Sequence, residues 1–330
     1  MWKLNPTRNR KDLVALLIAT AVSALLMLPA LAGARGVHQD NNQGEYKISV
    51  SVGLVVLPVR VTDHTGDFVT GLHATDFQVF EAGRLQEITL FDPEDVPVTV
   101  GLVVDNSGSM RSKRPGVVVA SLAFVKSSNP RDQMFVVNFN QNVTLGLPQS
   151  APFTSSPQQL RAALVKIPPA GNTALYDGIA AGLQHLKAGT GDRKALIVVT
   201  DGGDNASQLN FRDMLRMAEA SNAVIYTIGL LDQSFTDENP GVLRQLAKVT
   251  GGQAYFPTSL AEVQEITERI ARDIREQYTI GYVPANPVAD GKFRTIKVTA
   301  KAAGEGKLHV RTRAGYLPPS EAPLAASAAK

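Results

Sequence analysis

The chain of 330 residues contains no cysteine, only five histidines and 6% aromatic residues. Without cysteine, it can form no disulfide framework, thiolate zinc site, iron–sulfur cluster or cysteine nucleophile. Packing must therefore hold the protein together, and 44% hydrophobic residues are an ordinary fraction for a globular core. The length suggests about two domains.

An excess of charge of one sign is also missing, with 33 Lys and Arg against 30 Asp and Glu. Four of the basic residues precede an apolar run that extends from residue 13 to about residue 32 and ends in small residues, Ala30, Ala32 and Ala34. This pattern predicts a secretory signal peptide in residues 1–34. Because a membrane span needs about 20 apolar residues, an uncleaved tether through residues 13–34 is the alternative. Without the leader the chain is formally neutral, which argues against a nucleic-acid partner.

Two separate segments show the period-two, β-branched pattern of strands. The first covers residues 35–96, with candidate strands at 46–52, 55–61, 77–80 and 88–91. The second covers residues 278–317, with candidate strands at 278–283, 293–299 and 308–311. A few strands in about 40 residues bury too little apolar surface to fold alone, so we expect the two segments to pair as one small β-sandwich.

Between these segments, residues 97–277 alternate apolar strands with amphipathic helices. Continuous apolar runs at 98–105 and 195–200 are typical of central strands buried on both faces. Further strands are expected at 133–139, 223–230 and 254–256, and helices at 110–126, 156–167, 174–186, 211–220, 240–250 and 259–276, the first interrupted early by Pro115. The alternation predicts an α/β fold with a doubly wound, mostly parallel sheet, inserted in or flanked by the sandwich. Residues 318–330 are expected to form a disordered tail.

Oxygen-bearing side chains follow the expected strands and precede one helix. Asp105, Ser107 and Ser109 come directly after the first strand, Thr173 precedes a helix, and Asp201 ends the strand at 195–200. Loops beyond the carboxyl ends of parallel strands form the binding crevice of an open sheet, so we expect these residues to converge. Two carboxylates and three hydroxyls, without His or Cys, form a hard donor set that suits Mg²⁺ or Mn²⁺. Individually, each could instead be a helix cap or turn residue.

These segments resemble the von Willebrand factor type A domain with its metal-ion-dependent adhesion site. The Asp-x-Ser-x-Ser motif matches Asp105, Ser107 and Ser109, the isolated Thr matches Thr173, and the last Asp matches Asp201 in Thr-Asp-Gly. The resemblance covers about residues 97–277 and implies a doubly wound α/β fold. The flanking segments, including Asp76-Phe-Gln-Val-Phe80, resemble the exported subgroup of this family that is abundant in acidobacteria.

The resemblance implies that Ser107, Ser109 and often Thr173 contact the metal, while Asp105 and Asp201 act largely through bound water. The expected ion is Mg²⁺, or Mn²⁺ or Ca²⁺ in its place. Few anionic ligands then reach the ion, so a Glu or Asp carboxylate from a protein partner can complete its octahedral shell. The expected function is that of an exported, metal-dependent protein-binding module of the cell envelope, periplasm or medium.

Two other functions are open at this stage. One is a structural module of a larger envelope assembly, of the kind described as calcium-activated channel homologues, although no second apolar span is present to line a pore. The other is a metal-dependent hydrolase. A hydrolase would need a positioned base, but no histidine lies near the expected site in sequence, and the chain has no Gly-x-Ser-x-Gly elbow and no phosphate-binding loop. We therefore expect no enzymatic activity.

Overall fold

The computed structural model describes residues 53–93, 96–127, 129–201, 203–231, 239–286, 291–302, 304 and 306–318. The chain divides into two compact units, Met1–Val50 and Ser51–Lys330, and every described residue belongs to the second. The expected leader or tether, the strand at 46–52 and the tail beyond residue 318 lie outside the described residues.

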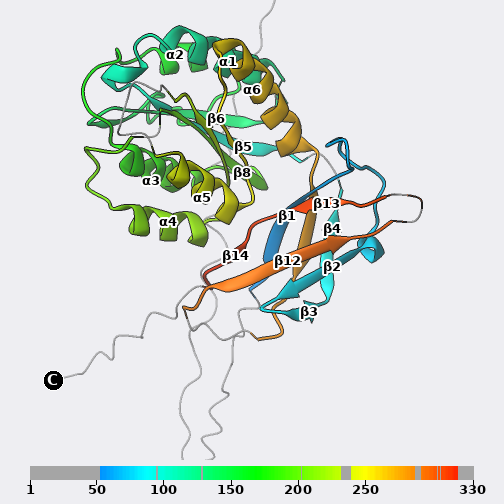
Figure 1. Cartoon of the computed structure of the whole chain (residues 1–330). Coiled ribbons are helices and arrows are strands. Elements are labelled where there is room, and N and C mark those ends of the chain that lie inside the picture. The colour runs from blue at the N-terminus through cyan, green and yellow to red at the C-terminus, as the bar shows by residue number, and fades with distance from the viewer. Residues whose placement is uncertain are drawn as a thin grey trace, which may run out of the picture. The chain divides into compact units, whose positions relative to one another are not determined.

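A six-stranded sheet forms the centre of the α/β region (Figure 1). Its strands lie in the order β10-β9-β8-β5-β6-β7, and all neighbours are parallel except β6 and β7. The bounds are β5 (Val98–Asp105), β6 (Gln133–Phe139), β7 (Val143–Leu145), β8 (Arg193–Thr200), β9 (Val224–Gly229) and β10 (Ala254–Tyr255). All eight residues of β5 are buried, as its continuous apolar run predicted.

Helices cover both faces of this sheet, which confirms the doubly wound α/β fold. One face packs against α1 (Arg114–Ser127), α2 (Pro157–Leu164) and α6 (Leu260–Arg275), and the other against α3 (Leu175–Leu186), α4 (Phe211–Ala220) and α5 (Pro240–Thr250). Successive side chains of β5 point into different cores, since Leu102 joins the first core and Val103 joins the second. The central strand is thus buried by helices from both sides.

The two flanking β segments pair with each other in two antiparallel sheets of four strands. The bounds are β1 (Val55–Thr62), β2 (Phe77–Glu81), β3 (Arg84–Gln86), β4 (Ile88–Asp92), β11 (Tyr278–Tyr282), β12 (Arg294–Ala300), β13 (His309–Arg311) and β14 (Gly315–Tyr316). Strand β1 lies between β11 and β13, and β12 lies between β2 and β14. Both sheets share one apolar core, which includes Leu57, Val79 and Tyr278. Each sheet therefore needs strands from both ends of the described chain.

Two local expectations were wrong, and some short strands were not foreseen. Pro115 does not interrupt a helix that begins at residue 110: residues Gly108–Met110 form a short 3₁₀ turn, and α1 begins at Arg114. Proline is tolerated there because the first N–H groups of a helix have no acceptor within it. Helix α2 ends at Leu164 rather than at residue 167, before Pro168. The short strands β3, β7 and β14 were not foreseen, since two or three residues carry no recognisable period.

A buried carboxylate ties α6 to the sandwich. Asp273 forms ion pairs with Arg60 of β1 at 2.9 Å and with Arg311 of β13 at 2.6 Å, and its side chain is only 3% exposed. A carboxylate buried to this extent is stable only when it is paired. The pairs therefore fix strands from both β segments onto the last helix of the α/β region.

None of the helices in the described part of the chain is both long and apolar enough to cross a membrane.

We predict that Asp273→Asn lowers the free energy of unfolding by about 2–3 kcal/mol, because it leaves two arginines without their shared anion. The effect stays below that of a fully buried pair, since Arg60 also lies 3.4 Å from Glu276. Urea denaturation measures the change. The control is Asp213→Asn, whose partner Arg216 is 65% exposed, and which should cost less than about 1 kcal/mol. Equal losses in the two variants would contradict the role given to Asp273.

Candidate functional site

The first site carboxylate stands at the end of the central strand. Asp105 is the last residue of β5 and is fully buried. Its Oδ2 accepts a hydrogen bond from Thr200 Oγ1 at 2.7 Å, and its Oδ1 accepts one from the backbone N–H of Ser107 at 2.7 Å. These two donors fix the carboxylate and partly offset the cost of removing it from water.

The two serines follow in the turn after β5. Their hydroxyl oxygens, Ser107 Oγ and Ser109 Oγ, lie 3.0 Å apart. Ser107 is buried and Ser109 is half-buried, while Gly108 between them is exposed. Met110 is fully buried in the core next to this turn and anchors it. The turn therefore presents two neighbouring hydroxyls beside an opening to solvent.

Thr173 belongs to a second loop that is joined to the serine turn. The N–H of Gly108 donates to the carbonyl of Gly171 at 3.0 Å, and Gly171 has a φ of +79°, which favours glycine. Thr173 itself is 5% exposed. Its N–H donates to Asn205 Oδ1 at 2.9 Å, and its carbonyl accepts from the N–H of Asn205 at 3.0 Å. The loop after β8 thus holds Thr173 in place.

The second carboxylate comes directly after β8, the strand beside β5. Asp201 is 6% exposed, and its Oδ2 is buried without a hydrogen-bond donor among the described residues. A cation, Lys113, lies close by: its Nζ is 3.9 Å from that oxygen and donates to the carbonyl of Leu230 at 2.6 Å. A distance of 3.9 Å gives an ion pair but no hydrogen bond. Asp201 therefore has an oxygen that a further positive group could satisfy.

Burial, together with the charge of Asp201, raises the pKa of Asp105 to about 6, against the hydrogen bonds from Ser107 and Thr200. Two carboxylates so close in a low-dielectric interior repel each other when both are ionised. A dication between them would remove the repulsion and satisfy Asp201 Oδ2. The donor set fits such an ion.

The structure thus links the five expected residues through contacts among three loops. Asp105, Ser107 and Ser109 are joined directly, Asp201 interacts electrostatically with Asp105, and Thr173 is tied to the serine turn through Gly171. Within the described part of the chain no group of three or more His, Cys, Asp and Glu could hold a metal. The candidate donors at this place are two carboxylates and three hydroxyls.

Sequence reasoning missed the residues that support the site. They are Thr200, which donates to Asp105, Lys113, which lies beside Asp201, and Asn205, which accepts the N–H of Thr173. Asp177 of α3 supports the loop after β8, since its carboxylate accepts hydrogen bonds from the N–H groups of Gln208 and Leu209 at 2.8 and 3.0 Å. No local pattern reveals these partners, since each contact joins segments about 30 or more residues apart.

Comparison with known proteins identifies the family. The sequence profile described as the von Willebrand factor type A domain matches residues 99–269, more than half of the chain. The chain belongs to the von Willebrand factor type A (VWA) domain family. VWA domains are generally adhesion or interaction modules, and metal-dependent binding occurs within the family. A comparison with curated proteins found no match.

Several solved structures resemble the chain. The structure titled von Willebrand factor type A from Catenulispora acidiphila is 15% identical, with a TM-score of 0.47, and the match covers 82% of this chain and 74% of that one. Proximal thread matrix protein 1 from the mussel byssus has a zinc-occupied metal-ion-dependent adhesion site (MIDAS) motif. It is 18% identical, with a TM-score of 0.47, over 59% of this chain and 49% of that one. The vWF domain of a type V pili tip protein from Porphyromonas gingivalis is 13% identical, with a TM-score of 0.44, over 55% of this chain and 97% of that one. At these scores the similarity indicates no shared activity.

We predict that Mg²⁺ stabilises the VWA domain more at pH 7.5 than at pH 5. Because the folded-state pKa of Asp105 lies above its ordinary value of 3.8, the cation-free protein loses stability as the pH rises from about 4 through about 6. A dication relieves this loss, and at pH 5 it must first displace the proton. Thermal unfolding with and without Mg²⁺ at both pH values measures the difference. In Asp105→Asn the difference should vanish; an equal shift at both pH values in the unaltered protein would contradict the prediction.

We also predict opposite effects of Lys113→Met on cation affinity and on stability. Removing a positive charge 3.9 Å from Asp201 Oδ2 should tighten Mg²⁺ binding severalfold, as expected for about 1 kcal/mol of relieved repulsion. The cation-free protein should become less stable, because Asp201 loses the counter-charge that Lys113 provides. Calorimetric titration and thermal unfolding measure the two effects. Lys126→Met, at the exposed far end of α1, is the control, and weaker Mg²⁺ binding by Lys113→Met would contradict the prediction.

Proposed function

We propose that the VWA domain holds a divalent cation at Asp105, Ser107, Ser109, Thr173 and Asp201, and uses it to capture a Glu or Asp carboxylate of a protein partner. The observation that carries this proposal is the pair of buried carboxylates at the ends of β5 and β8, one of which has an oxygen without a hydrogen-bond donor among the described residues. Buried polar atoms in proteins nearly always have a partner, because an unsatisfied one is costly. A cation supplies that partner.

Binding of an acidic group follows from the charge of the site. The donor set contains only two carboxylates, and the others are neutral hydroxyls. An ion held in this way keeps positive charge, so it favours an anionic ligand in its remaining position. The exposed Gly108 and the half-buried Ser109 lie on the side from which such a ligand can approach.

Mg²⁺ is the cation we propose, with Mn²⁺ or Ca²⁺ as substitutes. All five side chains offer oxygen, which hard cations prefer, while zinc usually takes nitrogen or sulfur ligands in proteins. The zinc-occupied MIDAS motif named for the mussel protein shows that this ion can occupy the motif there. Zinc therefore belongs among the ions to be compared with Mg²⁺ in a titration.

An exported location completes the proposal. Its support is the basic and apolar pattern of residues 1–34, which acts as a cleaved signal or, through residues 13–34, as a tether to the membrane. The protein would then work in the periplasm, in the cell envelope or outside the cell. Removal of the leader leaves no excess positive charge, and so no basis for binding nucleic acid.

Catalysis is less well supported than binding. The ring centroids of His185 and Phe135 lie 4.5 Å apart, and Nε2 of His185 lies 3.1 Å from the carbonyl oxygen of Pro152. His64, His73 and His309 belong to the sandwich segments. Among the described residues, no histidine hydrogen-bonds to any of the five proposed ligands. A hydrolase would need a base to activate water at the metal, and we assign none.

We expect Asp105→Asn and Asp201→Asn each to weaken Mg²⁺ binding by about 10- to 100-fold or more, because each removes one of two anions around the ion. Both variants keep the shape of the side chain, so the fold should survive, as circular dichroism can show. Calorimetric titration measures the affinity. Asp213→Asn, an exposed carboxylate of α4, is the control. Unchanged affinity in both site variants would refute the metal site.

The same variants test partner capture. Immobilised full-length protein should retain an envelope protein from its native organism in Mg²⁺, and release it when chelator is added or when Asp201 is replaced. Retention that persists in chelator would favour the structural-module function instead.

A further inference from the structure

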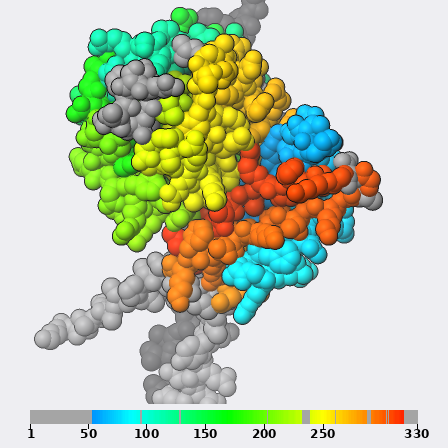
Figure 2. Space-filling model, viewed as in Figure 1, coloured from blue at the N-terminus to red at the C-terminus, as the bar shows by residue number. Residues whose placement is uncertain are grey.

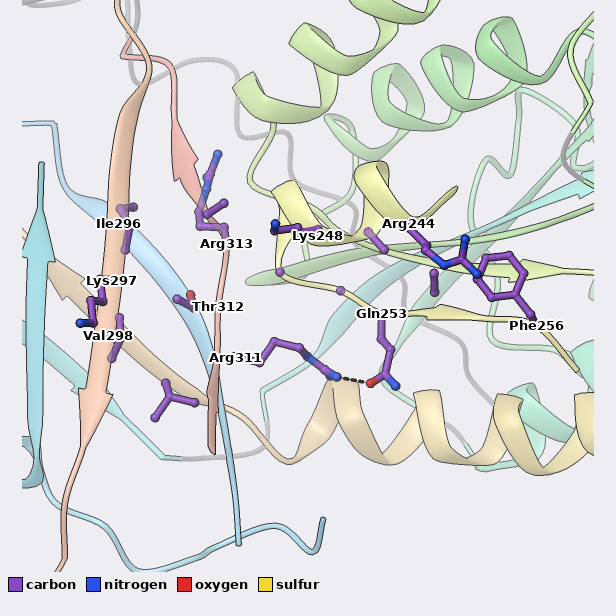
Figure 3. Close-up of a pocket in the computed structure, with 16 residues that line it drawn as sticks. Arg244, Lys248, Gln253, Phe256, Ile296, Lys297, Val298, Arg311, Thr312 and Arg313 are labelled. Atoms are coloured by element: carbon purple, nitrogen blue, oxygen red, sulfur yellow. Dashed lines mark hydrogen bonds between the residues drawn. The ribbon is translucent and has the colours of Figure 1, made fainter. Parts of the chain in front are cut away.

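A second candidate site lies where the α/β region meets the sandwich (Figures 2 and 3). A pocket of about 540 Å³ opens between the end of α5 with the turn that leads to β10 on one side, and β12, β13 and the residues after β13 on the other. This volume lies in the usual range of small-molecule sites, about 300–1,000 Å³. Nothing in the VWA function proposed above uses this pocket.

Its lining is strongly basic. Five of its residues carry positive charge and none is acidic: Arg244, Lys248, Lys297, Arg311 and Arg313. The chain as a whole has 33 basic and 30 acidic residues, so composition does not explain this concentration of one sign. A recess lined by one sign of charge attracts ligands of the opposite sign.

Two of the arginines are fixed by the protein itself. Arg311 donates to Asp273 at 2.6 Å and also contacts Gln253, as Figure 3 shows for the second contact. Arg313 donates to Asn222 Oδ1 at 3.2 Å and to the carbonyl of Gly315 at 2.7 Å. Both guanidinium groups are thus held rigidly. Asp273 offsets the charge of Arg311, whereas the hydrogen-bond acceptors of Arg313 are neutral and its charge is offset by electrostatic interaction with Glu219.

The other three cations are exposed and available. The side chains of Arg244, Lys248 and Lys297 make no hydrogen bond or ion pair within the described ranges, and the guanidinium of Arg244 lies 4.5 Å from the centroid of the Phe256 ring. Lys248 belongs to α5 and Lys297 to β12, so a lysine lines each wall of the pocket. In Figure 3 the ammonium group of Lys248 points from α5 toward β12, whereas that of Lys297 lies on the side of β12 away from α5, because its neighbours Ile296 and Val298 face the sandwich core. A ligand with more than one anionic group could bind Lys248 directly and Lys297 after a rotamer change of its exposed side chain.

The end of α5 does not oppose such a ligand. The carbonyl end of a helix normally carries partial negative charge. Here the carbonyl of Ala247 accepts from Gly252 at 2.9 Å and that of Val249 accepts from Ala314 at 3.2 Å. Gly251 has a φ of +83°, the left-handed conformation that caps a helix. These carbonyls near the helix end are therefore occupied, and the basic side chains dominate the pocket.

We infer that this pocket binds a soluble ligand that carries several phosphate groups. Lys and Arg donors bind phosphate oxygens through charge-assisted hydrogen bonds, and the pocket offers such donors from two walls. The inference does not rest on the metal site, whose carboxylates lie at the carboxyl ends of β5 and β8, whereas the pocket includes the turn that precedes β10.

Tripolyphosphate is the probe that tests the site. Calorimetric titration of the whole protein in chelator, without divalent cations, excludes binding through the metal site. Tripolyphosphate should bind, and the double variant Lys248→Gln/Lys297→Gln should weaken binding by about tenfold or more, through loss of two charge-assisted contacts. The matched control, Lys126→Gln/Lys187→Gln, removes the same charge from exposed positions elsewhere and should bind as the unaltered protein does. Asp105→Asn should also bind normally.

Three outcomes would overturn the inference. The first is the absence of tripolyphosphate binding, and the second is an equal loss in both double variants, which would indicate only net charge. The third is co-sedimentation with phosphatidylglycerol vesicles that depends on Lys248 and Lys297 while tripolyphosphate fails to bind, since the phosphate would then come from a lipid surface. None of these results bears on Mg²⁺ binding, which the variants Asp105→Asn and Asp201→Asn test separately.

Discussion

The two carboxylates buried side by side at the ends of β5 and β8 are the constraint on which the rest of the site depends. Strands β5 and β8 are parallel neighbours, with Val104 opposite Val199, so the residues that follow them meet at one edge of the sheet. Ionising both carboxylates there is unfavourable because little water is present to screen them. The surrounding hydrogen bonds and Lys113 offset only part of this cost. A dication bound between the carboxylates would offset the remaining repulsion.

The sandwich and the VWA domain are held together by charges as well as by the chain. Asp273 accepts Arg60 and Arg311, while Arg193 at the start of β8 donates to the carbonyls of Arg275 and Gln277 at 3.1 and 2.9 Å. Arg193 lies at the amino end of its strand, whereas the site carboxylates lie at the carboxyl ends. The contacts of Arg193 with the sandwich segment therefore lie at the end of the sheet opposite the site carboxylates.

The sequence predicted most of the regular structure because the buried strands and amphipathic helices have clear periods. Strand β6 and helices α4 and α5 begin and end where the pattern placed them. Errors arose where a short segment has no period, as in β7, or where the position of a residue within a helix decides its effect, as with Pro115. Proline disrupts the interior of a helix but fits its first turn.

The sequence by itself determined which residues could hold a cation, since the types and order of Asp105, Ser107, Ser109, Thr173 and Asp201 are legible without a structure. It also determined that the flanking β segments must pair, because neither could bury a core alone. Only the tertiary structure decided the surroundings of those residues, namely the free oxygen of Asp201, the nearby Lys113 and the basic pocket between α5 and β12. Those features depend on contacts between segments far apart in the chain, and such contacts leave no local pattern in the sequence.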